Sequence, residues 1–382
     1  MKRLLLALPI TLALASCGGG SDTKTSTAAA AKAPVKVADP LVTTYEGGLQ
    51  ILDRATLKVV HDIPLPGFNR VNAAGDGRHV LVSTATGFRV LDAAGATLRA
   101  EEFAAPKPGH VVRHAGRTVL FSDGTGKIMT FDPRELGTAL PKVTTHTSEH
   151  PHHGVAIQLK NGELVSTLGT EDKRTGIRVL NPQGTEITRN EQCPGVHGET
   201  TAKDETVVIG CENGVLIYAD GKITKVASPD EYGRIGNQAG HEESPIVLGD
   251  YKTDPDAELE RPERISLIDT TTNQLRLLDL GASYTFRSLG RGPHGEALVL
   301  GTDGALRVID PEKAKVTKTI KLLAPWKEPT DWQDARPALH VRDHTAYVTD
   351  PSTKRLHAVN IETGKIEATA DLPQAPNEIT GT

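Results

Sequence analysis

The chain has 382 residues, of which 37% are hydrophobic and only 4% aromatic. Its formal net charge is −5 and it has no basic block or stripe, so we expect no binding to nucleic acid through neutralised phosphates. Glycine (37 residues) and proline (24 residues) recur throughout, apolar residues come in short runs, and no long stretch keeps a helical period, which predicts an all-β protein.

The N-terminus has the pattern of a secretory signal peptide: two basic residues, an apolar run from Leu4 to Leu14, then small residues. The apolar run is too short to remain as a membrane span. The residues Leu-Ala-Ser before Cys17 resemble a bacterial lipobox. We therefore predict a lipoprotein signal peptide over residues 1–16 and lipidation of Cys17. An ordinary signal peptide with an incidental cysteine is the alternative.

Residues 17–40 are rich in Gly, Ser, Thr, Ala and Lys and offer almost nothing to bury, so we predict a flexible tether after the lipidated cysteine. Removing Lys2 and Arg3 with the signal peptide changes the net charge from −5 to −7. The mature protein is then expected in the periplasm, as a monomer anchored to the outer or inner membrane through its lipid.

A short apolar motif that ends in Asp or Asn recurs eight times. Its last residues are Asp53, Asp92, Asp132, Asn181, Asp220, Asp269, Asp310 and Asn360. The steps between them average about 44 residues, the period of a four-stranded propeller blade. We predict that residues 41–382 form a single β-propeller of about eight blades. A seven-bladed ring with one irregular unit is the alternative.

The first repeat starts at about Leu41, already at its second strand. Its missing inner strand is predicted to be the C-terminus, because residues 373–379 echo residues 64–71, which lead into the second repeat. Closing the ring in this way removes the exposed sheet edges of a linear array.

Histidines recur in phase with the repeat. His110, His153 and His197 are 43 and 44 residues apart, which predicts that they lie on the inner strands of three consecutive blades. His340 has nearly the same phase in the eighth repeat. Converging neutral imidazoles suit a tetrahedral zinc ion. Histidines that only bind backbone or water are the alternative.

A second concentration of histidine precedes the inner strand of the fourth repeat. It includes His146, His150 and His152, next to His153 and a glutamate. We interpret it either as a metal-capturing loop or as a solvated polar loop.

Two cysteines remain if Cys17 is lipidated. An oxidising compartment favours a disulfide between Cys193 and Cys211, which stand at the two ends of a predicted hairpin. A thiolate metal pair is the alternative.

These segments resemble the AztD-type zinc metallochaperones, which are secreted β-propellers. The resemblance covers most of the chain from Leu41 onward and rests on the segments 150–156, 193–199, 210–215 and 234–251. It implies an axial zinc site and a disulfide. We place the site on His110, His153 and His197, with His340 or, less favoured, Glu199, His152, His146 or His150 as a further ligand.

The resemblance also implies a function: a zinc metallochaperone, not an enzyme, that delivers zinc to the solute-binding protein of a zinc ABC transporter. One departure is that residues 18–40 contain no histidine, whereas that family has a His- and Asp-rich segment near its N-terminus. The alternatives are a propeller scaffold without metal transfer and a metal-dependent hydrolase of the lactonase kind.

Overall fold

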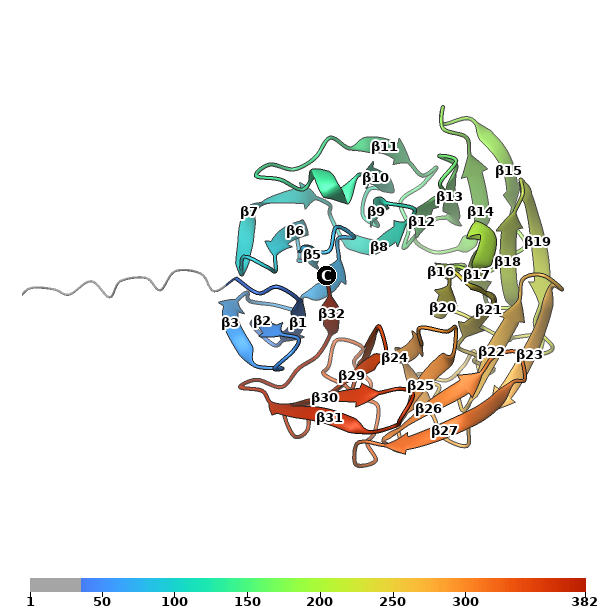
Figure 1. Ribbon diagram of the computed structural model, residues 1–382. Coiled ribbons are helices and arrows are strands. Elements are labelled where there is room, and N and C mark those ends of the chain that lie inside the picture. The colour runs from blue at the N-terminus through green and yellow to red at the C-terminus, as the bar shows by residue number, and fades with distance from the viewer. Residues whose placement is uncertain (1–35) are drawn as a thin grey trace, which may run out of the picture. The chain divides into compact units, whose positions relative to one another are not determined.

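The computed structural model describes residues 36–382, so the predicted signal peptide, Cys17 and nearly all of the predicted tether lie outside the described residues. The described chain forms eight four-stranded antiparallel sheets, arranged as blades around a central axis (Figure 1). This confirms the predicted all-β propeller and favours eight blades over seven.

Each blade has an inner, a second, a third and an outer strand. The inner strands are β4 (Arg70–Ala73), β8 (Pro108–His114), β12 (Ala156–Gln158), β16 (His197–Thr201), β20 (Gln238–His241), β24 (Tyr284–Arg291), β28 (Leu339–Arg342) and β32 (Ile379–Gly381). The second strands are β1 (Pro40–Tyr45), β5 (His79–Ser83), β9 (Arg117–Ser122), β13 (Leu164–Gly169), β17 (Val207–Cys211), β21 (Ser244–Gly249), β25 (Ala297–Gly301) and β29 (Thr345–Asp350).

The outer half of each blade follows the same order. The third strands are β2 (Gly48–Asp53), β6 (Gly87–Asp92), β10 (Lys127–Phe131), β14 (Arg174–Leu180), β18 (Gly214–Ala219), β22 (Arg264–Asp269), β26 (Ala305–Asp310) and β30 (Arg355–Asn360). The outer strands are β3 (Val59–Pro64), β7 (Thr97–Ala104), β11 (Thr144–Thr147), β15 (Glu186–Asn190), β19 (Lys222–Ala227), β23 (Gln274–Asp279), β27 (Lys315–Lys321) and β31 (Ile366–Asp371).

The described helices are two short 3-10 turns, η1 (Pro133–Glu135) and η2 (Lys203–Glu205). Within residues 36–382 we find no helix with the length and apolar character needed to cross a membrane.

The burial of the strands explains the apolar runs in the sequence. Second and third strands are covered on both faces by neighbouring blades, so β17 and most of β18 are buried. Outer strands alternate exposed positions with partly or fully buried ones, as in β27. The apolar clusters lie between blades. In one of them, Val42 and Ile51 of the first blade pack with Val80 and Val82 of the second.

The Asp or Asn that ends most of the motifs accepts a backbone hydrogen bond from the next turn. The Asp53 carboxylate accepts a hydrogen bond from the backbone N–H of Thr56 at 2.9 Å, and Asp92 accepts one from Gly95 at 2.9 Å. Such side-chain-to-backbone bonds are what Asp and Asn offer in turns. The recurring Asp or Asn therefore marks the turn between the third and outer strands.

The C-terminus closes the ring as predicted. Strand β32 pairs antiparallel with β1, with Leu41 opposite Gly381, so the last residues supply the inner strand of the first blade. The Glu378 carboxylate, just before β32, accepts hydrogen bonds from Arg70 at 2.9 Å and Arg287 at 3.2 Å. These guanidinium groups come from the second and seventh blades, so Glu378 joins both to the closing strand.

Two further features bear on the predictions. Cys193 and Cys211 form a disulfide, as predicted, which joins the start of the fifth blade to the end of β17. Val37 is buried in the core and its N–H donates to the carbonyl of Ala94, so the packed chain begins before residue 40.

Candidate metal centre

Three histidines from three consecutive blades meet at one point. His110, His153 and His197 each offer a ring nitrogen, and these atoms all lie within 4.8 Å of one another. The ring centroids are 5.0 to 5.3 Å apart. The Nε2 atoms of His153 and His197 are separated by 3.0 Å. Histidines one repeat apart in the sequence are therefore neighbours in the structure.

All three histidines lie where the chain enters the inner strands. His110 is the third residue of β8 and His197 is the first residue of β16. His153 lies three residues before β12 rather than on it, which differs from the predicted position. Gly154 follows His153 at a position with no room for a side chain, because a Cβ there would lie 2.4 Å from the Phe121 ring. Strand pairing begins only after this position, at Ala156.

Each histidine has a second partner that orients its ring. The Nδ1 atom of His153 lies 2.5 Å from an Asp123 carboxylate oxygen, and the Nδ1 atom of His197 lies 2.6 Å from the Gly236 carbonyl oxygen. The Nδ1 atom of His110 faces Glu199 at 3.4 Å. Partners of this kind fix ring orientation and tautomer in metal sites.

These partners determine which nitrogen of each ring carries a hydrogen. A carbonyl can only accept, so Nδ1 of His197 is the donor and its Nε2 holds a lone pair when the ring is neutral. The same assignment follows for His153 beside a carboxylate. Two nitrogen lone pairs then face each other, which is unfavourable unless a cation lies between them. Burial, together with repulsion from His110 and His153, holds the pKa of His197 well below its usual value, which keeps this ring neutral and its lone pair available to a metal ion.

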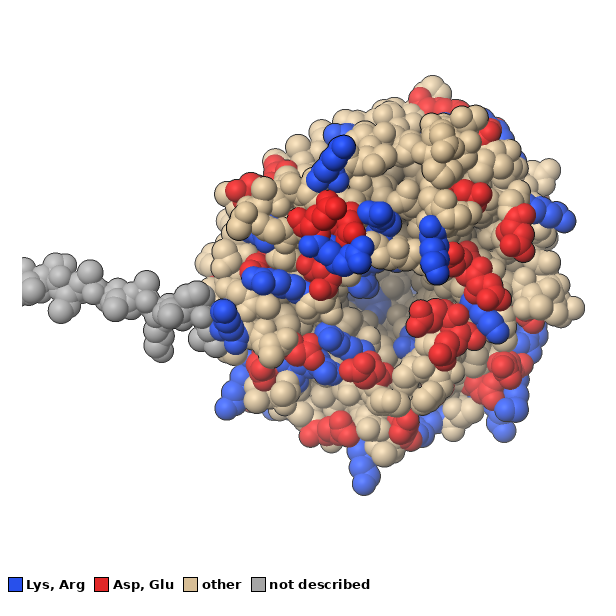
Figure 2. All heavy atoms as spheres, turned by 45° about the horizontal axis from the view of Figure 1, so that its top comes forward, with Lys and Arg blue, Asp and Glu red and all other residues tan. Residues whose placement is uncertain are grey.

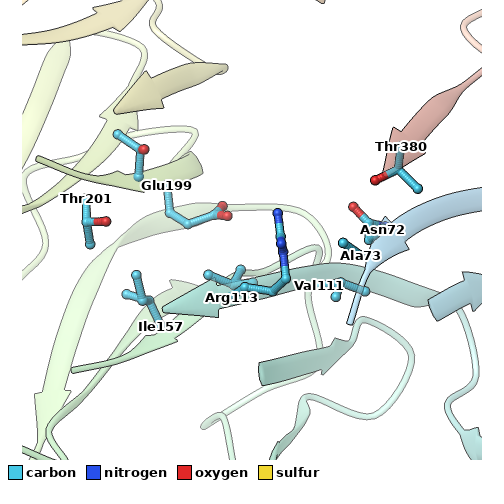
Figure 3. Close-up of a pocket in the computed structure, with 10 residues that line it drawn as sticks. Asn72, Ala73, Val111, Arg113, Ile157, Glu199, Thr201 and Thr380 are labelled. Atoms are coloured by element: carbon cyan, nitrogen blue, oxygen red, sulfur yellow. The ribbon is translucent and has the colours of Figure 1, made fainter. Parts of the chain in front are cut away.

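Glu199 lies between the three histidines and a cavity on the axis. This cavity, about 230 Å³ in volume, is lined by polar side chains that include Arg113 and Thr201. In Figure 3, Glu199 and Arg113 both extend into the open space between the inner strands. The histidine group is a set of imidazoles flanked by carboxylates.

His340 is not brought to this cluster. It lies on β28 of the eighth blade, and its Nε2 is 3.0 Å from the position that a Cβ at Gly381 would take. Burial, with Arg113 and Arg342 nearby, lowers the pKa of His340 to about 4. Its Nε2 is buried and has no hydrogen-bond partner among the described residues.

Of the histidines around the fourth inner strand, only His153 joins the cluster. His152 is buried, and its two ring nitrogens contact the His150 carbonyl and the Thr167 hydroxyl, each at 2.8 Å. His146 lies on the outer strand β11, where burial lowers its pKa. The structure therefore brings neither of them, nor His150, into the three-histidine group.

Sequence reasoning missed Asp123 and Gly236. Asp123 stands in the turn between β9 and β10, and antiparallel pairing places that turn at the same edge as the start of β8. Asp123 could have been found from the sequence. It is an acidic residue between the second and third strands of a blade that has a histidine near the start of its inner strand. Gly236 contributes only a backbone carbonyl, so no side-chain pattern indicates it.

Charges around the axis are mixed. Figure 2 shows a hollow at the centre of the ring, with acidic and basic side chains interspersed around it. Two carboxylates, Asp123 and Glu199, lie within 3.5 Å of the histidine rings. A cation at the rings would therefore meet negative charge nearby.

Comparisons with known proteins find a curated relative and several solved structures of similar fold. No family model matches the chain. The zinc chaperone AztD of Citrobacter koseri is 27% identical over 265 residues, which cover 67% of this chain and 61% of that protein. The chain thus matches about three fifths of the length of this curated relative.

Solved structures add a likeness of fold. The structure of apo AztD from C. koseri has a TM-score of 0.78 at 21% identity, covering 91% of this chain and 98% of that chain. A second AztD structure from the same organism has a TM-score of 0.77. The dihydro-heme d1 dehydrogenase NirN has a TM-score of 0.63 at 12% identity. This match covers 91% of this chain and 75% of the NirN chain. The chain is therefore similar to the zinc chaperone AztD, in sequence over two thirds of its length and in fold over nine tenths.

Proposed function

We propose that this protein binds zinc at His110, His153 and His197 and acts as a periplasmic zinc chaperone that delivers the ion to the solute-binding protein of a zinc ABC transporter. The observation that carries the proposal is the meeting of three oriented imidazoles from separate blades. The likeness to AztD supports zinc as the cargo and a chaperone rather than an enzyme as the class, since that curated relative is named as a zinc chaperone.

The chemistry of the three rings suits zinc. Neutral imidazoles bind Zn²⁺ at about 2.0–2.1 Å, and three of them leave a fourth tetrahedral position open. Glu199 is near enough to occupy that position or to orient His110, because it already faces the ring at 3.4 Å. We favour the orienting role, since the corresponding contacts of His153 and His197 are to atoms that only orient the rings.

Release to an acceptor needs an accessible ligand. The His153 side chain is 46% exposed, whereas its partner Asp123 is 14% exposed. An incoming ligand could bind zinc at the fourth position before His153 dissociates, so the ion would not pass through water. Because protons compete with zinc for imidazoles, binding should weaken as the pH falls through roughly 6.

Metal binding tests the first half of the proposal. The full chain, the double variant His153→Ala with His197→Ala, and the control His61→Ala are titrated with zinc against a competing chelator. His61 is exposed on an outer strand, so its loss should leave binding unchanged. We expect the double variant to lose the tight site. Wild-type zinc affinity in the double variant would reject the three-histidine site and favour the scaffold alternative.

Transfer tests the second half. Zinc-loaded protein is mixed with the zinc-free solute-binding protein in the presence of a chelator that captures released ions. Zinc that reaches the acceptor faster than the chelator intercepts it supports direct delivery. Capture of all zinc by the chelator would limit the function to storage.

The lipid anchor at Cys17 is part of the same proposal. The full chain is expected in the membrane fraction, and the variant Cys17→Ser in the soluble periplasmic fraction. Equal distribution of the two would reject anchoring and leave the ordinary signal peptide.

A further inference from the structure

A second group of metal-ligating side chains lies in the seventh and eighth blades. His294, His344 and Glu362 each offer a ligand atom, and these atoms lie within 4.8 Å of one another. One oxygen of Glu362 is 2.8 Å from Nδ1 of His344 and 3.5 Å from Nε2 of His294. The two rings are 5.4 Å apart between centroids.

This group lies on the face of the propeller opposite to the three-histidine centre. His294 lies in the turn after β24, and His344 lies in the turn after β28, so both follow the end of an inner strand. His110 and His197 instead lie where inner strands begin. Glu362, in the turn between β30 and β31, is at the same edge as His344, because antiparallel strands alternate in direction.

The backbone of these turns is fixed by contacts within and between the two blades. The Ile361 N–H donates to the His344 carbonyl at 2.9 Å, which places Glu362 beside His344. Lys318 of the seventh blade donates to the carbonyls of Ile361 and Glu362. The Glu296 carboxylate accepts a hydrogen bond from the His294 N–H at 3.0 Å and so holds the third turn. The backbone positions of the three ligands are therefore set by hydrogen bonds, while their side chains are exposed to solvent.

We propose that His294, His344 and Glu362 form a second zinc site, exposed to solvent and exchanging its ion more readily than the axial centre. Two imidazoles and one carboxylate are a zinc ligand set. Ligand atoms around tetrahedral zinc are about 3.3 Å apart for bonds of about 2.0–2.1 Å. The two contacts of Glu362, 2.8 and 3.5 Å, lie on either side of this spacing. The side chains are 49% to 64% exposed, so the remaining position faces water.

The openness of the site determines its behaviour. An ion held by three exposed side chains has no enclosing wall, and none of the three has an orienting partner like Asp123 or Gly236 among the described residues. We therefore expect weaker binding and faster exchange than at His110, His153 and His197. The site does not depend on the proposed chaperone function, since it shares no residue with the axial centre.

The test counts zinc in the full chain by titration followed by elemental analysis. Wild type is expected to bind about two ions, and His153→Ala with His197→Ala about one. Adding His344→Ala and Glu362→Gln to that background should remove the remaining ion, while adding the control His61→Ala should not. In the same backgrounds, Co²⁺ absorption bands should respond to the Glu362 change.

The outcomes separate the two sites. A remaining ion that is unaffected by His344→Ala with Glu362→Gln would overturn the second site and leave the axial centre untouched. Loss of the axial ion with retention of the exposed one would support both assignments. Because all three residues are exposed, the melting temperature of these variants should equal that of their parents, and this measurement excludes misfolding as the cause of any loss.

Discussion

The Nε2 atoms of His153 and His197 lie 3.0 Å apart, although 44 residues separate them in the chain. Asp123 holds the opposite side of the His153 ring, and the Gly236 carbonyl holds that of His197. Each lone pair is therefore aimed at the centre of the cluster. Such preorganisation lowers the cost of ordering the ligands on binding.

This relationship predicts an effect of Asp123 on zinc affinity without direct contact to the ion. In Asp123→Ala, His153 loses its Nδ1 partner and with it the fixed tautomer and ring orientation. We expect zinc affinity to fall by roughly 10–100-fold, the usual effect of removing such a partner. Competition against a chromogenic chelator measures the change.

Asp172→Ala is the matched control, because Asp172 is an exposed acid of the fourth blade outside the site. Its affinity should equal that of wild type. An Asp123→Ala variant with unchanged affinity would show that the carboxylate does not orient His153.

The fold could be predicted because the repeat is a local signal. Asp53 and Asp92 recur since each forms the same turn, and the buried second and third strands require apolar runs. The cluster of His110, His153 and His197 could also be predicted, because equal phase in consecutive blades places residues at the same height around one axis.

Phase alone could not decide which histidines meet. His340 has the right phase, but the eighth blade is not adjacent to the third, fourth and fifth, so its ring faces Gly381 and not the cluster. His152 is next to His153 in sequence, yet both of its nitrogens are used by the protein. The sequence could not indicate that His294 and His344 meet, because turn histidines are usually only solvated and their proximity depends on how two blades pack.

The disulfide between Cys193 and Cys211 predicts a joint effect on stability and zinc binding. It closes a loop with a sequence separation of 18, and constraining such a loop in the unfolded chain contributes roughly 3 kcal/mol. His197 lies four residues after Cys193 and pairs with Gly210, so the bridge also anchors one ligand strand. We expect Cys193→Ser with Cys211→Ser to lower the unfolding free energy by that amount and to weaken zinc binding.

Denaturant unfolding and zinc titration of the oxidised wild type and the double variant measure both effects. Reduced wild type should behave like the variant. Equal denaturation midpoints for the oxidised and reduced forms would contradict the stabilising role.

The closing strand predicts a large effect of one carboxylate. The Arg287 side chain is 5% exposed and Glu378 is 9% exposed, and burial lowers the pKa of Arg287 to about 10. Glu378→Ala leaves this guanidinium buried without its counter-charge, which costs roughly 3–5 kcal/mol. Thermal unfolding should show a clear fall in melting temperature, as should deletion of residues 377–382.

Asp371→Ala is the comparison, because it removes a surface ion pair with Arg355 at a side chain that is 83% exposed. Pairs of this kind contribute within about 1 kcal/mol. Equal losses in the two variants would mean that closure does not depend on the buried pair.

The half-buried imidazole of His340 predicts acid destabilisation. Its pKa falls from the usual 6.5 to about 4 on folding, so between these values the unfolded chain takes up a proton that the folded chain does not. The stability is therefore full above pH 6.5, is lost as the pH falls toward 4, and amounts to about 3 kcal/mol at most. His340→Asn cannot titrate, so its unfolding free energy should fall less than that of wild type between pH 7.5 and pH 4.5. The exposed control His61→Asn should follow wild type, and parallel pH profiles for wild type and His340→Asn would contradict the assignment.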